Sequence, residues 1–314
     1  MAQLQTIDPL RIGVVVGSSR GPVEVNHLLG ARTPKRPTDS LYISFSSISG
    51  VIASALQIQG CSLMSSATCI SGAAALKTGM AMIHSGELDI VLAGGVDAPL
   101  VDPLLEQYAA TGVLATDVGP QALQPFARTR TGTVLGEGSA FVVLESEASA
   151  LRRGVPIRGL IHHVAVGCDF GSRAGTNTGE ALRQTTERAL LAMKTTSQEI
   201  DLLHLHGTGT QLNDAMESRC VQSIFGPEKY QPHSWASKGV TGHTLGASAL
   251  FQVVLTLEAL GQSFLPGSAN STDPDPACPL RLQRGLGAKM SLRKALCLTS
   301  GFWGNTSCIG LSLP

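Results

Sequence analysis

The stretch CSLMSSATCISGAAALKTGM, residues 61–80, decides the fold of this chain. Its first part is a short apolar run typical of a strand, and its second part is a run of small residues typical of a helix. Cys69 lies where one changes into the other, and Gly72 allows backbone segments to approach closely there. A thiol at a helix N-terminus lies near free N–H groups and the positive end of the helix dipole, which favour the thiolate. We therefore expect a strand, a sharp turn and a helix that present Cys69 as a nucleophile, although a buried structural cysteine is the open alternative.

The same alternation of apolar runs and helical patterns continues on both sides of this stretch. Strands are expected over 11–17, 61–67, 88–97, 139–146, 158–169, 200–209, 233–238, 294–301 and 306–313, and helices over 47–58, 70–86, 147–153, 178–194, 215–225 and 246–260. Such alternation predicts an α/β fold in which helices cover sheets. It occurs twice, over about 1–150 and 151–314, which indicates a duplicated core.

The composition excludes several classes of protein. The 314 residues include 23 Lys and Arg against 23 Asp and Glu, only 15% of residues are charged, and 43% are hydrophobic. High apolar content with little charge excludes a disordered chain. The zero net charge gives no support to nucleic-acid binding and favours self-association, so we expect an oligomer.

The chain shows no signal for a membrane or an oxidising compartment. No apolar run approaches the ~20 residues of a membrane-spanning helix, and the start, MAQLQTIDPL, does not resemble a signal peptide. The seven cysteines are scattered, without a CxxC pair, and do not resemble a zinc site. We expect a cytoplasmic protein with reduced thiols and no bound metal.

Two further motifs carry reactive side chains. In HGTGTQLNDAME, residues 206–217, His206 ends an apolar run, and Asp214 and Glu217 fall in the first turns of the next helix, where acidic groups are favoured. In SKGVTGHTLGAS, residues 237–248, Lys238 and His243 flank a glycine-rich turn. Neither motif matches a nucleotide-binding loop. One cysteine and two histidines, each expected where a strand changes into a helix, are suitable parts for acyl-thioester chemistry.

Taken together, the three motifs resemble the β-ketoacyl synthase, or ketosynthase, family. The resemblance runs from about residue 11 to the C-terminus, and it rests on the cysteine turn, HGTGTxxND followed by a Glu, and KxxxGHxxGAS, in that order. It implies a thiolase-like fold with two similar α/β halves in an αβαβα arrangement. Residues 1–150 would carry the cysteine turn, and residues 151–314 would carry both histidine motifs.

The resemblance also implies roles for individual residues. Cys69 would accept an acyl chain from acyl carrier protein, and His206 and His243 would stabilise the enolate formed when malonyl-carrier protein loses CO₂. Lys238 and Glu217 would form a buried charged pair that orders the surroundings of the second histidine, with Asp214 in support. Thr208 and Thr210 would contact the phosphopantetheine arm, which belongs to the substrate. No metal or organic cofactor is implied.

The C-terminal loop departs from the family pattern. Members usually carry Gly-Phe-Gly-Gly-x-Asn here, whereas this chain has SGFWGNTS at residues 300–307. Aligned on Ser300 and Gly304, Trp303 stands at the gating position beside Phe302, Asn305 replaces a glycine, and Ser307 replaces the asparagine. We therefore expect Trp303 to shape the acyl tunnel, and its replacement by Phe or Ala to alter the accepted chain length.

The second departure is the short segment before the nucleophile, since only 68 residues precede Cys69. RIGVVVGSSRG resembles the family's second core strand, and the first strand, expected to lie centrally in its sheet, would then be absent. Three arrangements follow from this reading. Residues 10–16 take the central place, or the sheet is rebuilt, or a partner covers the gap.

Two functions fit the sequence. The first is a condensing acyltransferase of fatty acid or type II polyketide biosynthesis, which the presence of Cys69, His206 and His243 favours. The second is a non-catalytic partner resembling a chain length factor, which the short start and Trp303 favour. A thioester hydrolase is a distant third reading. Either main function implies acyl carrier protein as a partner and a homodimer, or a heterodimer with a full-length ketosynthase. Arg32, Lys35 and Arg36 would dock the carrier, or form an ordinary solvated loop.

Overall fold

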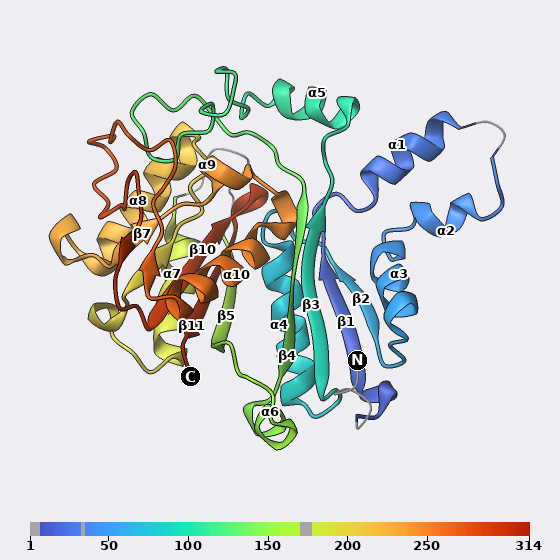
Figure 1. Cartoon of the computed structure of the whole chain (residues 1–314). Helices are drawn as coiled ribbons and strands as arrows, with labels where there is room; N and C mark the ends of the chain where they lie inside the picture. Colours follow the sequence, from blue (N-terminus) through green and yellow to red (C-terminus); the bar gives the residue numbers. More distant parts are fainter. Residues whose placement is uncertain (1–6, 33–34, 170–177) are drawn as a thin grey trace.

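A computed structural model describes residues 7–32, 35–169 and 178–314 of the chain. Its first half contains a four-stranded sheet of order β2-β1-β3-β4 (Figure 1). The strands are β1 (Ile12–Gly17), β2 (Ser62–Ser65), β3 (Ile90–Asp97) and β4 (Gly138–Glu145). The first three run parallel, and β4 runs antiparallel to β3. The interior strand β1 reads IGVVVG and is buried after its first residue, as expected for a parallel strand covered on both faces.

The second half contains a five-stranded sheet of order β5-β11-β10-β6-β7. Its strands are β5 (Leu160–Cys168), β6 (Leu202–His204), β7 (His233–Trp235), β10 (Lys294–Ser300) and β11 (Asn305–Ser312). Read from β7, three parallel strands are followed by the antiparallel β11, which repeats the order and directions of the first sheet. Strand β5 is added beyond β11. The fold is therefore built from two similar α/β halves, as the sequence predicts.

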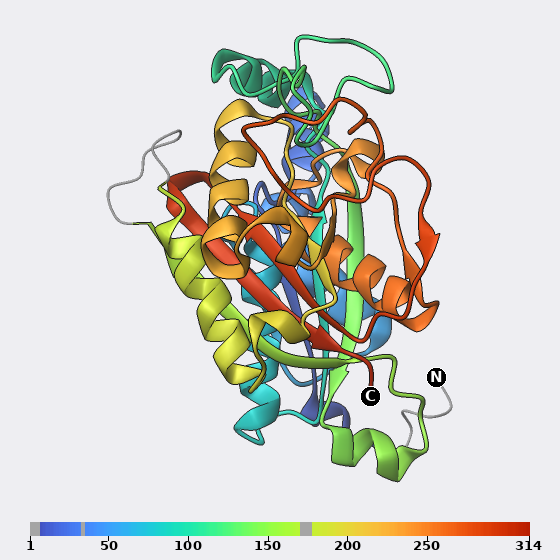
Figure 2. The same ribbon diagram turned by 90° about the vertical axis from the view of Figure 1, so that its left-hand side faces the viewer.

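Helices form three layers around the two sheets. The middle layer contains α4 (Ser71–His84) and α10 (Ser248–Gly261), which pack on both sheets and on each other. The outer layers contain α3 (Ser47–Leu56) on the first sheet and α7 (Glu180–Ala192) with α8 (Gln211–Phe225) on the second (Figure 2). The expected αβαβα arrangement is confirmed.

Small residues allow the middle layer to fit between the sheets. A Cβ atom added to Gly72 of α4 would lie 2.9 Å from the carbonyl oxygen of Gly246, and one added to Gly17 would lie 2.3 Å from the backbone of Ser71. Both approaches are too close for a side chain. The high glycine content therefore has a structural cause at the cysteine turn, where α4, β1 and the turn before α10 meet.

The expectation that a central strand is absent is wrong. Strand β1 occupies an interior position between β2 and β3. In the second half, β5 comes first in sequence and lies at the sheet edge, paired with β11 alone. By the duplication, the counterpart of β5 would pair with β4, whose outer edge has no strand partner among the described residues. Of the three arrangements considered, the first is supported in part, because residues 12–16 of the range 10–16 lie in the interior strand β1.

The remaining differences concern short or exposed elements. The strand expected over 200–209 ends at His204, because Gly207 and Gly209 have positive φ angles and break it. Helix α6 (Glu147–Arg153) is as expected. Elements that were not expected are α1 (Val23–Ala31), α2 (Asp39–Ile43), α5 (Asp102–Ala110), α9 (Lys238–Thr241), β8 (Phe264–Leu265) and β9 (Ala288–Lys289). Within the described ranges, no helix is both long and apolar enough to cross a membrane.

Candidate active site

Cys69 lies on a tight turn between β2 and α4, where the sequence places it. Thr68, just before it, has a φ of 53°, which is a strained value for a β-branched residue. The Ser71 hydroxyl closes the turn by donating to the Thr68 carbonyl at 2.6 Å and accepting from the Ala67 N–H at 2.9 Å. The thiol is thereby held at the N-terminal end of α4 with 7% of the residue exposed.

Burial, not the helix terminus, dominates the acidity of this thiol. Desolvation raises the pKa of Cys69 to about 11, against the opposing effect of the Lys238 charge and a backbone hydrogen bond from Phe302. Burial therefore outweighs the effects that favour the thiolate. The sulfur carries its proton at neutral pH and needs a base for nucleophilic attack.

His243 is placed to be that base. Its Nε2 lies 3.2 Å from Cys69 Sγ, and its Nδ1 lies 3.0 Å from the Ser248 hydroxyl at the start of α10. Burial and the nearby Lys238 charge hold the pKa of His243 well below its usual value, so the ring is neutral. The residue follows α9 rather than a strand, in contrast to the strand-to-helix position expected from sequence.

His206 is held by two buried charged side chains. Glu217 accepts the backbone N–H groups of His206 at 2.6 Å and Gly207 at 2.9 Å. Lys238 Nζ lies 3.1 Å from His206 Nδ1 and donates to the His206 carbonyl at 2.6 Å. An ammonium donating to Nδ1 leaves the ring proton on Nε2. The His206 and His243 rings meet edge to face, with centroids 5.2 Å apart.

The expected role of Lys238 and Glu217 is therefore corrected. Both contact the first histidine, His206, rather than the second, and among the described residues no ion pair joins the two directly. Burial lowers the pKa of Lys238 to about 8 and raises the pKa of Glu217 to about 7, each toward its neutral form. Each charged group is satisfied by the backbone around His206.

The threonines of this loop bond to one another and to the helix start. Thr208 Oγ1 and Thr210 Oγ1 are 3.0 Å apart, and Thr210 caps α8 by accepting the Asn213 N–H at 3.3 Å. Asp214 accepts the backbone N–H of Phe126 at 2.8 Å and of Gly209 at 3.2 Å. Its role in the structure is to fasten the loop that follows His206.

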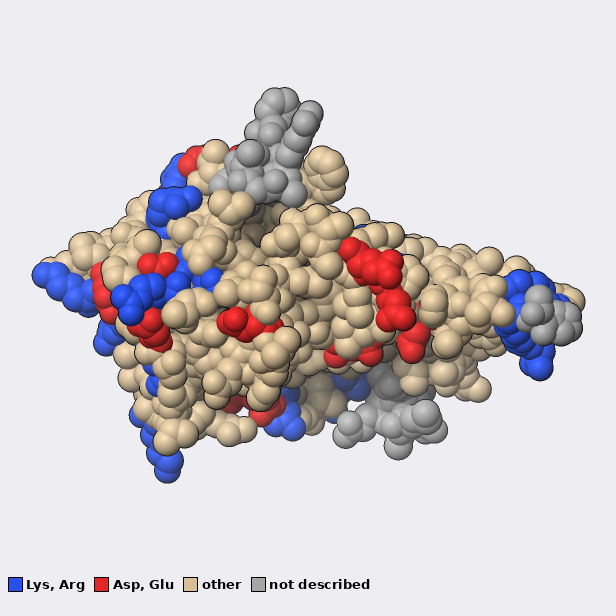
Figure 3. Space-filling view, turned by 90° about the horizontal axis from the view of Figure 1, so that it is seen from above, with Lys and Arg blue, Asp and Glu red and all other residues tan. Residues whose placement is uncertain are grey.

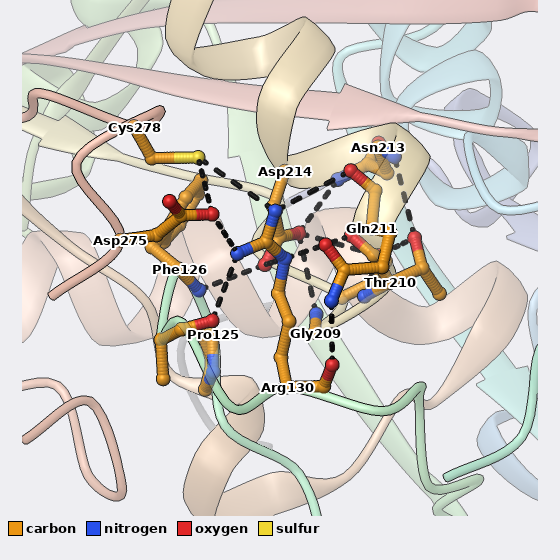
Figure 4. A network of polar contacts seen from close by, with 12 residues as sticks. Pro125, Phe126, Arg130, Gly209, Thr210, Gln211, Asn213, Asp214, Asp275 and Cys278 are labelled. Carbon is orange, nitrogen blue, oxygen red and sulfur yellow. Dashed lines mark hydrogen bonds and ion pairs between the residues drawn. The ribbon is translucent and has the colours of Figure 1, made fainter. Parts of the chain in front are cut away.

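Arg130, which sequence reasoning missed, forms a buried polar frame with Thr210, Asp214 and Asp275 (Figure 4). Its side chain is buried, donates to the carbonyls of Ala127 and Thr210, pairs with Asp275, and lies 3.8 Å from Asp214. Arg130 and its partners lie up to about 145 residues apart in sequence, so no local sequence pattern could predict these contacts.

The C-terminal loop places Phe302, not Trp303, against the cluster that contains Cys69. Phe302 packs on the cluster around Cys69 and stacks on Tyr108 of α5, with centroids 6.2 Å apart. Trp303 is 64% exposed. Trp303 and Gly304 have φ angles of 63° and 72°, whereas that of Asn305 is −61°. The loop therefore matches Gly-Phe-Gly-Gly with Trp303 at the first paired glycine and Thr306 at the asparagine, one position away from the expected alignment.

A third buried carboxylate, Asp97, was not anticipated from the sequence. It accepts from the Ser18 hydroxyl at 2.7 Å and from the backbone N–H groups of Ser19, Arg20 and Gly246 at 2.9, 3.0 and 2.6 Å. These bonds join the loop after β1 to the turn before α10. No cluster of three side chains suited to metal binding occurs in the part of the chain that the structure describes.

Comparison with known proteins gives a consistent family. The family model "Beta-ketoacyl synthase, N-terminal domain" matches residues 2–150, and "Beta-ketoacyl synthase, C-terminal domain" matches residues 158–272. A curated relative, "Putative polyketide beta-ketoacyl synthase 1" of Streptomyces virginiae, is 30% identical over 99% of this chain and 77% of its own length.

Solved structures agree with this result. The AntDE:AntF complex, a type II PKS acyl-carrier protein with its ketosynthase bound to the hexaketide, has a TM-score of 0.92 and 25% identity over 98% of this chain and 79% of that one. The ishigamide ketosynthase/chain length factor has a TM-score of 0.86 and 27% identity over 97% of this chain and 76% of that one.

Proposed function

The chain belongs to the β-ketoacyl synthase family, and we propose that it is a condensing subunit that joins an acyl thioester to a malonyl-carrier thioester with loss of CO₂. The observation that carries the proposal is the contact of Cys69 Sγ with His243 Nε2 at 3.2 Å, beside a second neutral histidine whose ring is fixed by Lys238. This arrangement supplies a nucleophile, a base and two hydrogen-bond donors.

In the first half-reaction, the protein takes the acyl chain onto its cysteine. Neutral His243 accepts the Cys69 proton, and the sulfur attacks the thioester carbonyl of the acyl carrier. The backbone N–H groups of Cys69 and Phe302 would stabilise the oxyanion that forms on the thioester carbonyl. The Phe302 N–H is already directed at the Cys69 sulfur. The carrier thiol leaves with the proton that His243 accepted.

In the second half-reaction, the malonyl thioester loses CO₂. The Nε2–H group of His206 would donate to its carbonyl and stabilise the enolate, and His243 would donate as well once its single ring proton has moved to Nε2. The enolate carbon then attacks the Cys69 thioester, forms the new C–C bond and frees the cysteine sulfur. Thr208 and Thr210, near His206, would contact the pantetheine arm. The reaction needs no metal or organic cofactor in this proposal.

Acylation of Cys69 tests the proposal directly. Incubation with an acyl-carrier thioester should add one acyl mass to the wild-type chain, and Cys69→Ala should remove the adduct. Cys168→Ser is the matched control, because Cys168 is an exposed thiol and should not carry the chain. Absence of an adduct on the wild type, alone or with a co-purified ketosynthase, would contradict a catalytic role.

The loop at Trp303 favours a second candidate. A tryptophan in left-handed backbone beside Phe302 makes this loop unlike the expected pair of glycines. The second candidate is therefore a non-catalytic partner resembling a chain length factor, which binds a full-length ketosynthase without being acylated. Co-purification with such a ketosynthase, together with the acylation assay, separates the two candidates.

The surface around β2 supports a subunit partner. Strand β2 is an edge strand, and large apolar side chains on α2 and α3, among them Leu41, Tyr42, Ile43 and Val51, are exposed nearby. Exposed apolar surface of this kind marks interfaces. We place a homodimer or heterodimer contact on this side and expect a cytoplasmic protein. A dimer mass in light scattering, lost on Tyr42→Asp, would support the assignment.

The cationic end of the molecule is a weaker candidate for carrier docking. Figure 3 shows Lys and Arg side chains at the end formed by the connection between α1 and α2. Arg32 pairs with Asp39, and Lys35 donates to the carbonyls of Leu29 and Gly30, so two of the three expected docking cations bond within their own loop. This favours the reading of an ordinary solvated loop.

A further inference from the structure

A charged side chain, Arg20, lies at the border of the apolar cluster around Cys69. Its Nη2 donates to the Tyr108 hydroxyl at 2.6 Å, and its guanidinium lies over the Tyr108 ring, 5.0 Å from the centroid. Tyr108 belongs to the same buried cluster as Cys69, and it also stacks on Phe302. The positive charge of Arg20 acts on Cys69 by lowering the pKa of the thiol against the larger effect of burial.

The backbone holds Arg20 in this position. Its N–H donates to Asp97 at 3.0 Å, and Asp97 also accepts the N–H of Gly246 in the turn before α10. The side chain therefore leaves a fixed loop and reaches the inner face of α5. A flexible surface arginine would not be anchored in this way.

Arg20 also has an unused donor. Its Nε is buried and has no hydrogen-bond partner among the described residues. A buried donor of a charged group without an acceptor is costly, and native structures rarely leave one. The Tyr108 oxygen accepts from Arg20, so the phenol proton is free to donate as well. Both donors thus lie at the border of the buried cluster that contains Cys69.

We infer that Arg20 and Tyr108 form a subsite for an oxygen atom of the acyl chain carried by Cys69. The acyl group would then be an oxoacyl chain rather than a saturated one, an inference that rests on the proposed function. An oxygen on the chain would accept from Arg20 Nε–H and Tyr108 O–H. A saturated chain would offer no acceptor to either donor. Sites built to hydrogen-bond a substrate group discriminate strongly against analogues that lack it.

The transfer step itself is the ordinary thioester exchange. The bond from Cys69 sulfur to the acyl carbon forms, the bond from the carrier sulfur breaks, and the proton of Cys69 passes through His243 to the carrier thiol. Arg20 and Tyr108 bind the distant oxygen and exchange no proton or electron with it.

A competition experiment tests this subsite. Octanoyl-, 3-oxooctanoyl- and 5-oxooctanoyl-pantetheine are offered together at equal concentrations, and the Cys69 adducts are compared by intact mass before acylation is complete. Since a hydrogen bond to a charged group changes rates by about tenfold to a hundredfold, the wild type should prefer at least one oxoacyl chain by that factor. The Arg20→Met variant should be acylated by all three thioesters at almost equal rates. The Tyr108→Phe variant should show a preference between those of the wild type and of Arg20→Met.

Two further variants keep the test decisive. Arg128→Met removes an exposed arginine and should retain the wild-type preference. Arg20→Lys keeps the charge but lacks the Nε–H, and it should lose the preference even if Arg20→Met does not fold. Acylation of the wild type without an oxoacyl preference, or a preference that survives both Arg20 variants, would overturn the inference alone. No adduct from any of the three thioesters would overturn the proposed function, and the inference with it.

Discussion

At the scale of single residues, the reactivity of Cys69 is decided by competition between burial and local dipoles. The turn before α4 offers free N–H groups, yet the thiol is almost fully covered and its pKa rises to about 11. In the proposed mechanism, His243 therefore acts as a base during attack, rather than as the partner of a preformed ion pair.

This competition makes the alkylation of Cys69 pH-dependent in a defined way. A thiol with a pKa near 11 gains thiolate continuously as the pH rises, so the rate of its reaction with iodoacetamide should increase about tenfold per pH unit from 7 to 9. The rate is read from Cys69-containing peptides by mass spectrometry. A plateau near pH 7 would show a preformed thiolate and contradict this account.

The neighbours Phe302 and Trp303 should respond differently to truncation. Phe302→Ala removes a ring that packs beside Cys69 and should change the chain lengths accepted by the acylation assay. Trp303→Gly removes an exposed side chain from left-handed backbone, which costs a non-glycine residue about 1 kcal/mol, and should leave chain length unchanged while maintaining or raising the melting temperature. A change in chain length with Trp303→Gly alone would place Trp303 in the tunnel after all.

At the scale of elements, buried carboxylates fasten the loop that carries His206. Glu217 takes the N–H groups at its start, and Asp214 takes the Gly209 N–H further along and ties the loop to Phe126. Both carboxylates come from α8, so the helix and the loop form one rigid unit. Arg130 balances the charge of Asp214 at 3.8 Å.

Two arginines two residues apart test the importance of that frame. Arg130→Met should lower the free energy of unfolding by about 3–5 kcal/mol, because it leaves buried carboxylates unpaired. Arg128→Met is the matched control, since Arg128 forms an exposed ion pair with Asp273 and should cost about 1 kcal/mol or less. Urea titrations give both values, and equal losses would mean that the buried frame contributes no more than a surface pair.

The two antiparallel strands should differ in hydrogen exchange. Strand β11 lies between β10 and β5, whereas β4 pairs with β3 alone among the described residues. We expect the β4 amides that point away from β3 to exchange at least about 100-fold faster than those of β11, because unpaired amides need no opening of the sheet. Uniform protection along β4 would show that another segment or a partner covers this edge.

At the scale of the whole molecule, the sequence predicts those helices, strands and turns that a local residue pattern specifies. The runs around Cys69 and the long α7 pattern specify their elements, and the glycines after His206 specify a turn. Helix α1 escaped prediction because it buries none of its residues and therefore has no apolar stripe. The pairs Arg20–Tyr108 and Arg130–Asp214 are about 80–90 residues apart. Tertiary packing brings them together, within the first half for Arg20–Tyr108 and between the halves for Arg130–Asp214. The C-terminal loop was aligned one position away from its family pattern because only backbone angles show which position needs a glycine.

Condensation in a single reaction tests the central claim most directly. Malonyl-carrier protein is mixed with the acylated protein, and the mass of the carrier-bound product is measured by mass spectrometry. The acylated protein is used alone or with a co-purified ketosynthase whose own active-site cysteine is replaced. We predict release of CO₂ and a 3-oxoacyl product extended by two carbons, lost in His206→Ala although that variant still forms the Cys69 adduct. A wild-type adduct that is never extended, or an extension that persists in His206→Ala, would contradict the account.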